Sequence, residues 1–239
     1  MKKYLLVIMA LLGIANLQAK TLRVGTNATY PPFESFNEKG ELVGFDIDLL
    51  NSIAKKLNYK LEYIDLPFEG LIQELESEKV DLVISCLSET SDRKKKVNFS
   101  DGYMKIGVFV IVKQDNNTIK SAKDLKKGIK LGVETGSSQV KYSEENYKGV
   151  ELVFFNNVDI YTALETGKVD AILMDDIPAL AYLKSKGKGK LKIVGDKINP
   201  KNAGMAFNKK NTALLKEINK ALKEVRSSGE YKKIYDKWI

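Results

Sequence analysis

The chain has 239 residues, of which 44% are hydrophobic and 29% are charged, with one cysteine and no histidine. A single cysteine cannot form an intramolecular disulfide, and the lack of histidine argues against catalytic triads and zinc sites. The formal charge of +8 raises the question of nucleic acid, but the lysines are scattered without interleaved aromatic residues or a reading motif, so we expect no nucleic-acid partner.

The N-terminus has the features of a secretory signal peptide. Lys2 and Lys3 precede an apolar run from Tyr4 to Ala15, and the segment ends in small residues up to Ala19. The run is too short to cross a bilayer of about 30 Å, and no other segment approaches about 20 consecutive apolar residues. We predict export to the periplasm, cleavage after Ala19 and no stable membrane insertion, and loss of the two lysines lowers the formal charge from +8 to +6.

Short apolar, β-branched runs alternate with helical patterns along the rest of the chain. In the first half, strands are predicted at 22–25, 61–64 and 80–85, with helices around 47–57 and 69–78. After the apolar run 108–112, strands are predicted near 130–134, 151–155, 169–174 and 191–195, with helices between them. A helical pattern over 211–227, a stop at Gly229 and a short last helix end the chain. The alternation indicates βαβ units and a parallel sheet covered on both faces.

An internal echo supports two similar lobes, although it is also a common way to encode a helix-to-strand turn. Leu75 to Ile84 (LESEKVDLVI) reads like Leu164 to Leu173 (LETGKVDAIL). A polar cluster follows each strand, Ser85 to Ser88 in the first copy and Asp175 with Asp176 in the second. Ligands bind at the carboxyl ends of strands in open α/β sheets, so facing lobes would bring Ser88 and Asp175 to the same small molecule.

These segments contain the charges that an α-amino acid, a zwitterion, requires. Arginine offers paired donors matched to a carboxylate, so Arg93 is a candidate for the ligand carboxylate and Asp175 for its ammonium. The turn from Gly136 to Gln139 lies between a strand ending at Glu134 and a helix beginning near Ser138. Its free N–H groups could share the carboxylate, but the same turn also reads as an ordinary N-cap without a ligand.

Several motifs together resemble one known family. They are Val24 to Glu34 (VGTNATYPPFE), Gly44 to Leu49 (GFDIDL), Ser85 to Arg93, Gly136 to Gln139, and Asp175. The chain resembles the polar amino-acid-binding proteins of bacterial ABC importers, the solute-binding protein family 3, over essentially its whole mature length. The resemblance implies an α/β fold of two Rossmann-like lobes joined by a two-segment hinge, the type II periplasmic binding protein fold.

The two lobes have predicted boundaries. We expect lobe 1 to comprise residues 20–106 and 203–239, and lobe 2 to comprise residues 107–202. The crossing segments are expected near 104–110 and 198–206. Hinge motion about these segments would close the lobes around a ligand.

The resemblance also implies roles for residues that hold the ligand backbone. In similar proteins, the arginine at the place of Arg93 binds the carboxylate, helped by the residue at the place of Ser138. The acid at the place of Asp175 holds the ammonium, together with the Ser88 position and a carbonyl near Ser85. The buried thiol of the only cysteine is expected to trim the pocket and to perform no chemistry.

Other positions bear on the ligand side chain. Tyr30 and Phe68 match two walls that sandwich it, although without the resemblance both read as core. In similar proteins an acid often stands at the place of Asn27 and contacts the cationic end of the ligand side chain. Glu134 could restore this negative charge from the opposite lobe. Asn27 and Gln139 would equally suit glutamine. The predicted ligand site comprises Asn27, Tyr30, Phe68, Ser85, Cys86, Ser88, Arg93, Glu134, Ser137, Ser138, Gln139 and Asp175.

We therefore predict a monomeric, non-enzymatic receptor that delivers a free L-amino acid to inner-membrane ABC permease subunits, with arginine, lysine, ornithine or histidine as ligand. The chain lacks a Gly-x-Ser-x-Gly elbow, a metal-spaced cysteine cluster and a phosphate loop, so no catalytic residue, metal or cofactor is expected. The alternatives are a receptor for glutamine or another polar amino acid, a sensor or adhesin, and a prephenate or arogenate dehydratase on the same scaffold. A dehydratase substrate would require a second cationic group in the pocket, and none is evident from the sequence.

Overall fold

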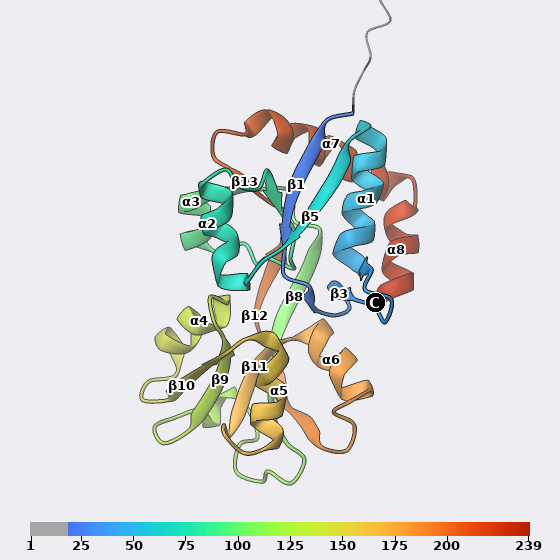
Figure 1. Cartoon of the computed structure of the whole chain (residues 1–239). Coiled ribbons are helices and arrows are strands. Elements are labelled where there is room, and N and C mark those ends of the chain that lie inside the picture. Colours follow the sequence, from blue (N-terminus) through green and yellow to red (C-terminus); the bar gives the residue numbers. More distant parts are fainter. Residues whose placement is uncertain (1–18) are drawn as a thin grey trace, which may run out of the picture.

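A computed structural model of the chain describes residues 19–239, which form two lobes stacked one above the other (Figure 1). The sheet of the first lobe contains β1 (Thr21–Thr26), β5 (Lys60–Asp65), β6 (Leu82–Val83), β7 (Val97–Phe99) and β13 (Ala206–Asn208). The sheet of the second lobe contains β8 (Met104–Lys113), β9 (Lys130–Glu134), β10 (Glu151–Phe155), β11 (Ala171–Asp175) and β12 (Leu191–Ala203). The strand orders are β5-β1-β6-β13-β7 and β10-β9-β11-β8-β12. The two-lobed α/β architecture confirms the predicted fold class.

Both sheets are mixed, which corrects the expectation of a parallel sheet. β1 pairs in parallel with β5 and β6, and β9 pairs in parallel with β10 and β11. β13 pairs antiparallel with β6 and β7, and β8 pairs antiparallel with β11 and β12. The antiparallel pairs arise because the chain leaves the first lobe and returns to it, so that outgoing and returning segments run in opposite directions.

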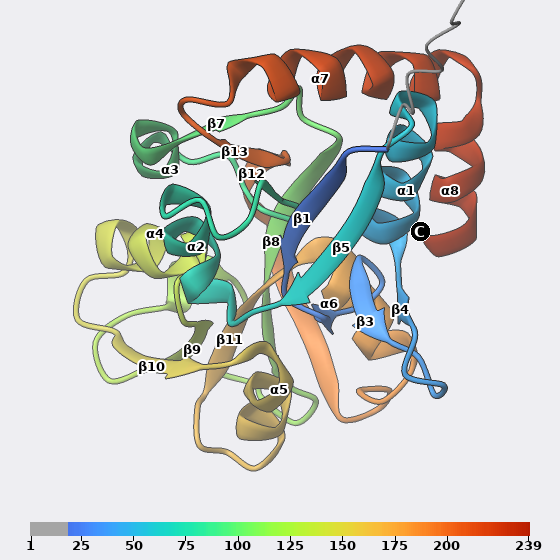
Figure 2. The same cartoon turned by 45° about the horizontal axis from the view of Figure 1, so that its top comes forward.

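Helices cover the sheets of both lobes. In the first lobe they are α1 (Phe45–Leu57), α2 (Leu71–Glu76), α3 (Ser91–Lys96), α7 (Thr212–Ser227) and α8 (Glu230–Trp238), with a 3-10 turn η1 (Phe68–Gly70) before α2. In the second they are α4 (Ser138–Asn146), α5 (Asn157–Glu165) and α6 (Asp176–Lys184), with a second 3-10 turn at Ala122–Asp124. Figures 1 and 2 show α1, α7 and α8 together on one side of the first sheet and α2 and α3 on the other.

A small three-stranded sheet leads into α1 and fixes where that helix begins. It consists of β2 (Thr29–Tyr30), β3 (Glu34–Phe36) and β4 (Leu42–Val43). Gly44 has φ 143°, and a Cβ at this position would lie 2.0 Å from the carbonyl oxygen of Phe33. Only glycine permits this approach, which lets the N–H of Asp46 donate to that carbonyl at 3.0 Å. Asp46 is thereby held beside β3 in the core.

The hinge consists of two long strands that run side by side from one lobe to the other. β8 and β12 pair antiparallel from Met104 opposite Ala203 to Lys113 opposite Leu191. The register shifts on both sides of Ile198, where the ladder is irregular. An isolated bridge between Ser88 and Ala203 ties the returning strand to the first lobe. The structure therefore has the predicted two-segment hinge, and β8 and β12 overlap the predicted crossing segments 104–110 and 198–206 but extend further into the second lobe.

The two copies of the internal echo occupy matching places. The first links α2 to β6, which lies beside β1, and the second links α5 to β11, which lies beside β9. Both turns contain a residue with positive φ, Glu78 at 60° in the first copy and Gly167 at 76° in the second. The same local structure therefore delivers a polar strand end to the cleft in each lobe.

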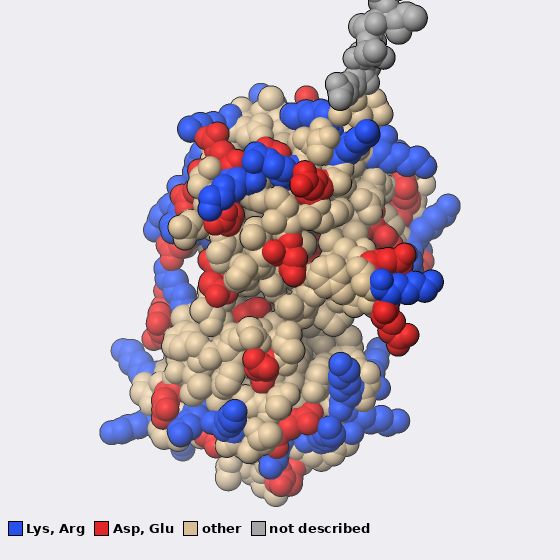
Figure 3. Space-filling view, viewed as in Figure 1, with Lys and Arg blue, Asp and Glu red and all other residues tan. Residues whose placement is uncertain are grey.

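Charged side chains of both signs are interspersed over the face of both lobes that Figure 3 shows. Within residues 19–239, no helix has the length and apolar character needed to cross a membrane. The predicted signal peptide lies outside the described residues, apart from Ala19.

Candidate functional site

One narrow cavity lies between the lobes, and its free volume of about 10 Å³ is no more than a single water molecule needs. The structure places all twelve predicted site residues around it: Asn27, Tyr30, Phe68, Ser85, Cys86, Ser88, Arg93, Glu134, Ser137, Ser138, Gln139 and Asp175. Their part in ligand binding stays a prediction, but their convergence from six separate segments of the chain makes this cavity the candidate site.

Strand ends deliver most of these side chains. β1 and β6 of the first lobe end near Asn27 and Ser85, and β9 and β11 of the second lobe end at Glu134 and Asp175. This is the edge of an open α/β sheet at which ligands bind. α4 begins at Ser138 beside the cavity, so its unpaired N–H groups face the same space.

Arg93, on α3 of the first lobe, reaches across to the second. Its Nη1 donates to the carbonyl of Ser88 at 2.9 Å, and its Nη2 donates to the carbonyl of Gly136 at 3.0 Å. The guanidinium lies over the ring of Phe68, 5.4 Å from its centre. Burial lowers the pKa of Arg93 to about 10, partly offset by Asp175 and Glu134. The side chain is therefore a positive charge at neutral pH.

Asp175, buried at the end of β11, accepts hydrogen bonds from both lobes. The hydroxyl of Tyr30 donates to its Oδ2 at 2.9 Å, and Nε2 of Gln139 donates to its Oδ1 at 2.7 Å. Burial raises the pKa of Asp175 to about 6, against the hydrogen bond from Tyr30 and the charge of Arg93. The group is ionised at neutral pH and suits a cation.

Glu134 is a second carboxyl group at the same cavity. Burial, together with the negative charge of Asp175, raises the pKa of Glu134 to about 8, while the charge of Arg93 lowers it. Its carboxyl makes no hydrogen bond or ion pair within the described residues 19–239. Asn27, by contrast, donates from Nδ2 to the carbonyl of Leu66 at 2.8 Å and accepts at Oδ1 from the hydroxyl of Thr29. Both polar atoms of its amide therefore already have hydrogen-bond partners in the first lobe.

The lobes touch on both sides of the cavity. On one side, Lys141 forms an ion pair with Asp92. On the other, Nδ2 of Asn157 donates to the carbonyl of Thr29 at 2.5 Å. The structure therefore has the lobes closed against each other, and a ligand would be enclosed.

Lys201 was missed by sequence reasoning, and it lies near the cavity without lining it. It lies half-buried on β12 and lines, with Arg93 and Ser138, the hollow at the mouth of the cleft. Burial and the charge of Arg93 lower the pKa of Lys201, whereas Asp175 raises it. No sequence signal marks it, because it is one of many lysines and only the hinge brings it here.

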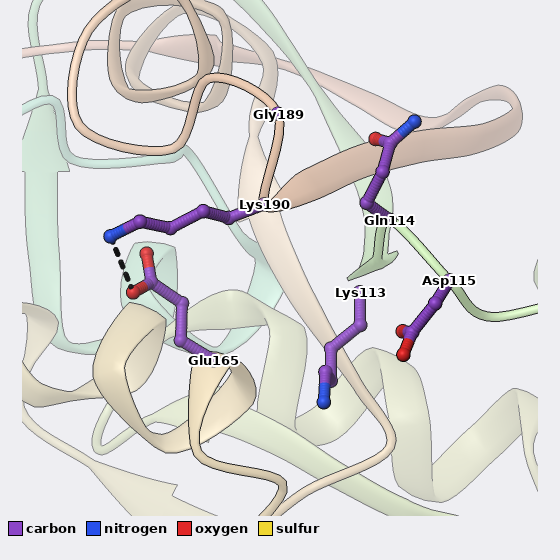
Figure 4. A pocket seen from close by; sticks show the side chains of 6 residues that line it. All are labelled: Lys113, Gln114, Asp115, Glu165, Gly189 and Lys190. Atoms are coloured by element: carbon purple, nitrogen blue, oxygen red, sulfur yellow. Dashed lines mark hydrogen bonds and ion pairs between the residues drawn. The ribbon is translucent and has the colours of Figure 1, made fainter.

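A larger hollow, of about 490 Å³, lies elsewhere and is a weaker candidate. Figure 4 shows its lining, in which Nζ of Lys190 pairs with Glu165 at 3.1 Å. It is open, and none of the predicted site residues lines it. Within residues 19–239, no group of three or more histidine, cysteine, aspartate or glutamate side chains is placed to hold a metal ion.

Comparison with known proteins gives consistent matches. The family model for bacterial extracellular solute-binding proteins, family 3, matches residues 22–239. The chain is 36% identical to the arginine-binding periplasmic protein of Mannheimia haemolytica, over 100% of this chain and 99% of that protein. It is 33% identical to the histidine-binding periplasmic protein of Escherichia coli K12, over 100% of this chain and 97% of that protein.

Solved structures match equally well. An ancestral arginine-binding protein is 45% identical, both in a structure bound to arginine (TM-score 0.86, covering 92% of this chain and 98% of that one) and in one bound to glutamine (TM-score 0.88, covering 93% and 99%). The substrate binding protein of an amino acid ABC transporter is 40% identical, with a TM-score of 0.85 and coverage of 92% and 99%.

Proposed function

Because the chain belongs to the bacterial extracellular solute-binding proteins, family 3, we propose that it is the substrate-binding component of an ABC amino-acid importer and that its ligand is a free basic L-amino acid, arginine first. The proteins similar to it are binding proteins, not enzymes, and two of them are named for binding arginine or histidine.

The charge balance of the cavity carries this proposal. Arg93 supplies one positive charge, and Asp175 and Glu134 supply two carboxyl groups. The carboxylate of an α-amino acid pairs with the guanidinium, whose planar fork matches it, and the ammonium pairs with Asp175. Glu134 then remains for a second positive charge, which arginine, lysine and ornithine carry and neutral amino acids lack. The rings of Tyr30 and Phe68 favour a cation further, by about 0.5–2 kcal/mol.

Glutamine is the second candidate, and the state of Glu134 favours it. With a pKa of about 8 this carboxyl is largely protonated at neutral pH, so it could donate to a ligand amide. The ancestral protein that resembles this chain has been solved with glutamine as well as with arginine. The two candidates differ in whether their binding releases a proton, because only a cationic ligand favours the ionised form of Glu134.

Closure by hinge motion follows from the same proposal. We assign residues 20–106 and 203–239 to lobe 1 and residues 107–202 to lobe 2, so that Arg93 and Asp175 come from different lobes. Signal-peptide cleavage after Ala19, a monomeric state and transfer of the ligand to permease subunits complete the proposed role in the periplasm.

A dehydratase is disfavoured by the charges, since its substrate would require a second cation in the cavity and Lys201 lines only the hollow at the mouth of the cleft. A dicarboxylate such as prephenate would have to place its extra carboxylate in a cavity that already contains Asp175 and Glu134. Purified protein incubated with prephenate should release no phenylpyruvate, and multiple turnover would overturn the assignment as a binding protein.

A thermal-shift screen against all standard amino acids plus ornithine tests the proposal. A ligand at 100 times its dissociation constant stabilises the protein by about 2.7 kcal/mol. We expect the largest shifts with arginine, ornithine or lysine, and smaller ones with glutamine. No shift with any amino acid, or shifts with acidic amino acids alone, would refute the proposed ligand class.

A further inference from the structure

Two acidic side chains lie in the core behind the candidate site. Glu34 begins β3 and Asp46 lies in the first turn of α1, and both are completely buried, with an exposed fraction of 0%. Neither lines the cavity, and the proposed ligand contacts do not use them. A buried carboxyl group costs free energy of folding unless it is paired or protonated. These two groups must therefore have either partners or a proton.

Each carboxyl group is bonded to the segment that lines the cavity. The hydroxyl of Ser85 donates to Oε1 of Glu34 at 2.8 Å. The N–H of Cys86 donates to Oδ2 of Asp46 at 2.7 Å, and the hydroxyl of Tyr103 donates to the same oxygen at 2.6 Å. The negative charge of Asp46 also raises the pKa of Glu34, which indicates that the two carboxyl groups are close to each other.

The remaining oxygen of each carboxyl group lacks a hydrogen-bond donor among residues 19–239. Oε2 of Glu34 and Oδ1 of Asp46 are buried, and no donor within the described residues bonds to them. No lysine or arginine of residues 19–239 pairs with either carboxyl. The titratable groups that face the pair from the neighbouring elements are neutral or acidic: Tyr63, Cys86, Tyr103, Glu134 and Tyr231. A single proton between the unpaired oxygens gives both a partner and removes the contact between two like charges.

The peptide between Ser85 and Cys86 links this pair to the ligand. In a trans peptide the N–H and the C=O point in opposite directions. Because the N–H of Cys86 points into the core at Asp46, the carbonyl of Ser85 points the other way, toward the cavity that Ser85 lines. Cys86 has φ 42°, a left-handed conformation that non-glycine residues adopt at a cost of about 1–3 kcal/mol. The hydrogen bonds to the acid pair hold this conformation.

We propose that Glu34 and Asp46 share one proton and form a positioning pair, which holds the Ser85–Cys86 peptide so that its carbonyl accepts the ligand ammonium. The inference rests on the proposed function for the identity of the ligand, but the shared proton does not depend on any ligand. Protonated, the pair is an acid and a carboxylate in one hydrogen bond. Without the proton, two buried carboxylates repel each other and release the peptide.

The proton makes the stability of the protein depend on pH. Burial raises the pKa of both groups, to about 7 for Asp46 and well above its usual value for Glu34. Since the folded protein binds this proton more tightly than the unfolded chain, the stability it contributes is complete below the unfolded-state pKa of about 4 and is lost as the pH rises through the folded-state pKa. Stability should therefore decline from about pH 4 upward and level off above the folded-state pKa.

Carboxyl 13C NMR of the ligand-free protein tests the shared proton, with the resonances assigned by their loss in Glu34→Gln and Asp46→Asn. At pH 7 we expect the two groups to hold one proton between them. Two ionised carboxylates, or two protonated acids, would overturn the proposal. Because no ligand is present, this measurement is independent of whether the thermal-shift screen identifies an amino acid.

Two substitutions at Glu34 test the positioning role. In Glu34→Gln the amide oxygen can still accept from Ser85 while the amide N–H donates permanently to Asp46. We expect this variant to keep arginine affinity within about threefold, an energy difference below about 0.7 kcal/mol, and to lose most of the decline in melting temperature with rising pH that we expect of the parent. Glu34→Ala should weaken arginine at least tenfold. Equal losses in the two variants, or parallel pH profiles for Glu34→Gln and the parent, would overturn the role; should Glu34→Ala not fold, the pH comparison alone decides.

Discussion

Replacement of Glu134 by glutamine separates the proposed basic ligand from a neutral one through the pH dependence of binding. In the free protein this carboxyl has a pKa of about 8, so it is mostly protonated at neutral pH. A cationic ligand favours the ionised form, so that binding releases the proton. Affinity for arginine should therefore rise with pH up to the pKa of the free protein.

The size of this effect follows from the pKa. With a value of about 8, about 1% of Glu134 is ionised at pH 6 and about 24% at pH 7.5, so arginine affinity should rise about twentyfold over this interval. Asp175, with a pKa of about 6, goes from about half to almost fully ionised and adds about twofold for any α-amino acid. Glutamine should therefore gain only about twofold.

Isothermal titration calorimetry in two buffers that differ in ionisation enthalpy measures both affinity and released protons. At pH 7 arginine should release close to one proton from the parent protein and only a small fraction from Glu134→Gln, with glutamine as the matched neutral ligand. At pH 7.5 the variant should lose about threefold to thirtyfold in arginine affinity, because a charged hydrogen bond contributes about 1.5–3 kcal/mol and ionising Glu134 takes back about 0.8 kcal/mol. The same pH slope for both ligands, or an unchanged slope in the variant, would refute the charge assignment.

Three further substitutions probe the other charges. Arg93→Ala should abolish binding of every amino acid in the thermal-shift screen, because it removes the handle shared by all of them; retained affinity would exclude Arg93 from the site. Asp175→Asn should keep the melting profile of the free protein but weaken binding at least tenfold, about 1.4 kcal/mol, by calorimetry; an unchanged affinity would count against its contact with the ammonium. Lys141→Ala breaks exposed ion pairs with Asp92 and, within α4, with Glu145 and should change affinity by less than about threefold, so a tenfold loss would mean that the pair with Asp92 holds the lobes closed.

Periodicity predicted the elements that have a continuous apolar pattern. The strands expected near 130–134 and 151–155 are β9 and β10 with those bounds, and the helix expected over 211–227 is α7. In the run 80–85 only Leu82–Val83 belongs to β6. The N–H of Ile84 still donates to the carbonyl of Gly25 on β1, but the N–H of Cys86 donates to the side chain of Asp46, so the strand does not continue. The antiparallel strands could not be predicted either, since local pattern carries no information on which lobe a returning segment joins.

The site residues that belong to recognisable sequence motifs could be predicted. All twelve residues were chosen from strand ends, charge types and family resemblance, and the structure gathers them around one cavity. Lys201 carries no motif, and its place depends on the pairing of β12 with β8. Glu34 and Asp46 lie within quoted motifs, but two acids 12 positions apart reveal their contact only when β3 and α1 are folded together.

The groups proposed to meet the ligand already have partners within the protein, and this limits what each can contribute. Arg93 donates to two carbonyls, and Asp175 accepts from Tyr30 and Gln139. A zwitterion that replaces some of these bonds gains only the difference in free energy between the new hydrogen bonds and those that they replace. This gain is the same whatever the side chain of the ligand is. Discrimination must therefore come from a group outside this exchange. Glu134 makes no side-chain hydrogen bond within residues 19–239, so a cation gains the whole interaction there less the cost of ionising the carboxyl. Preference for basic over neutral ligands therefore rests on this carboxyl, together with the rings of Tyr30 and Phe68.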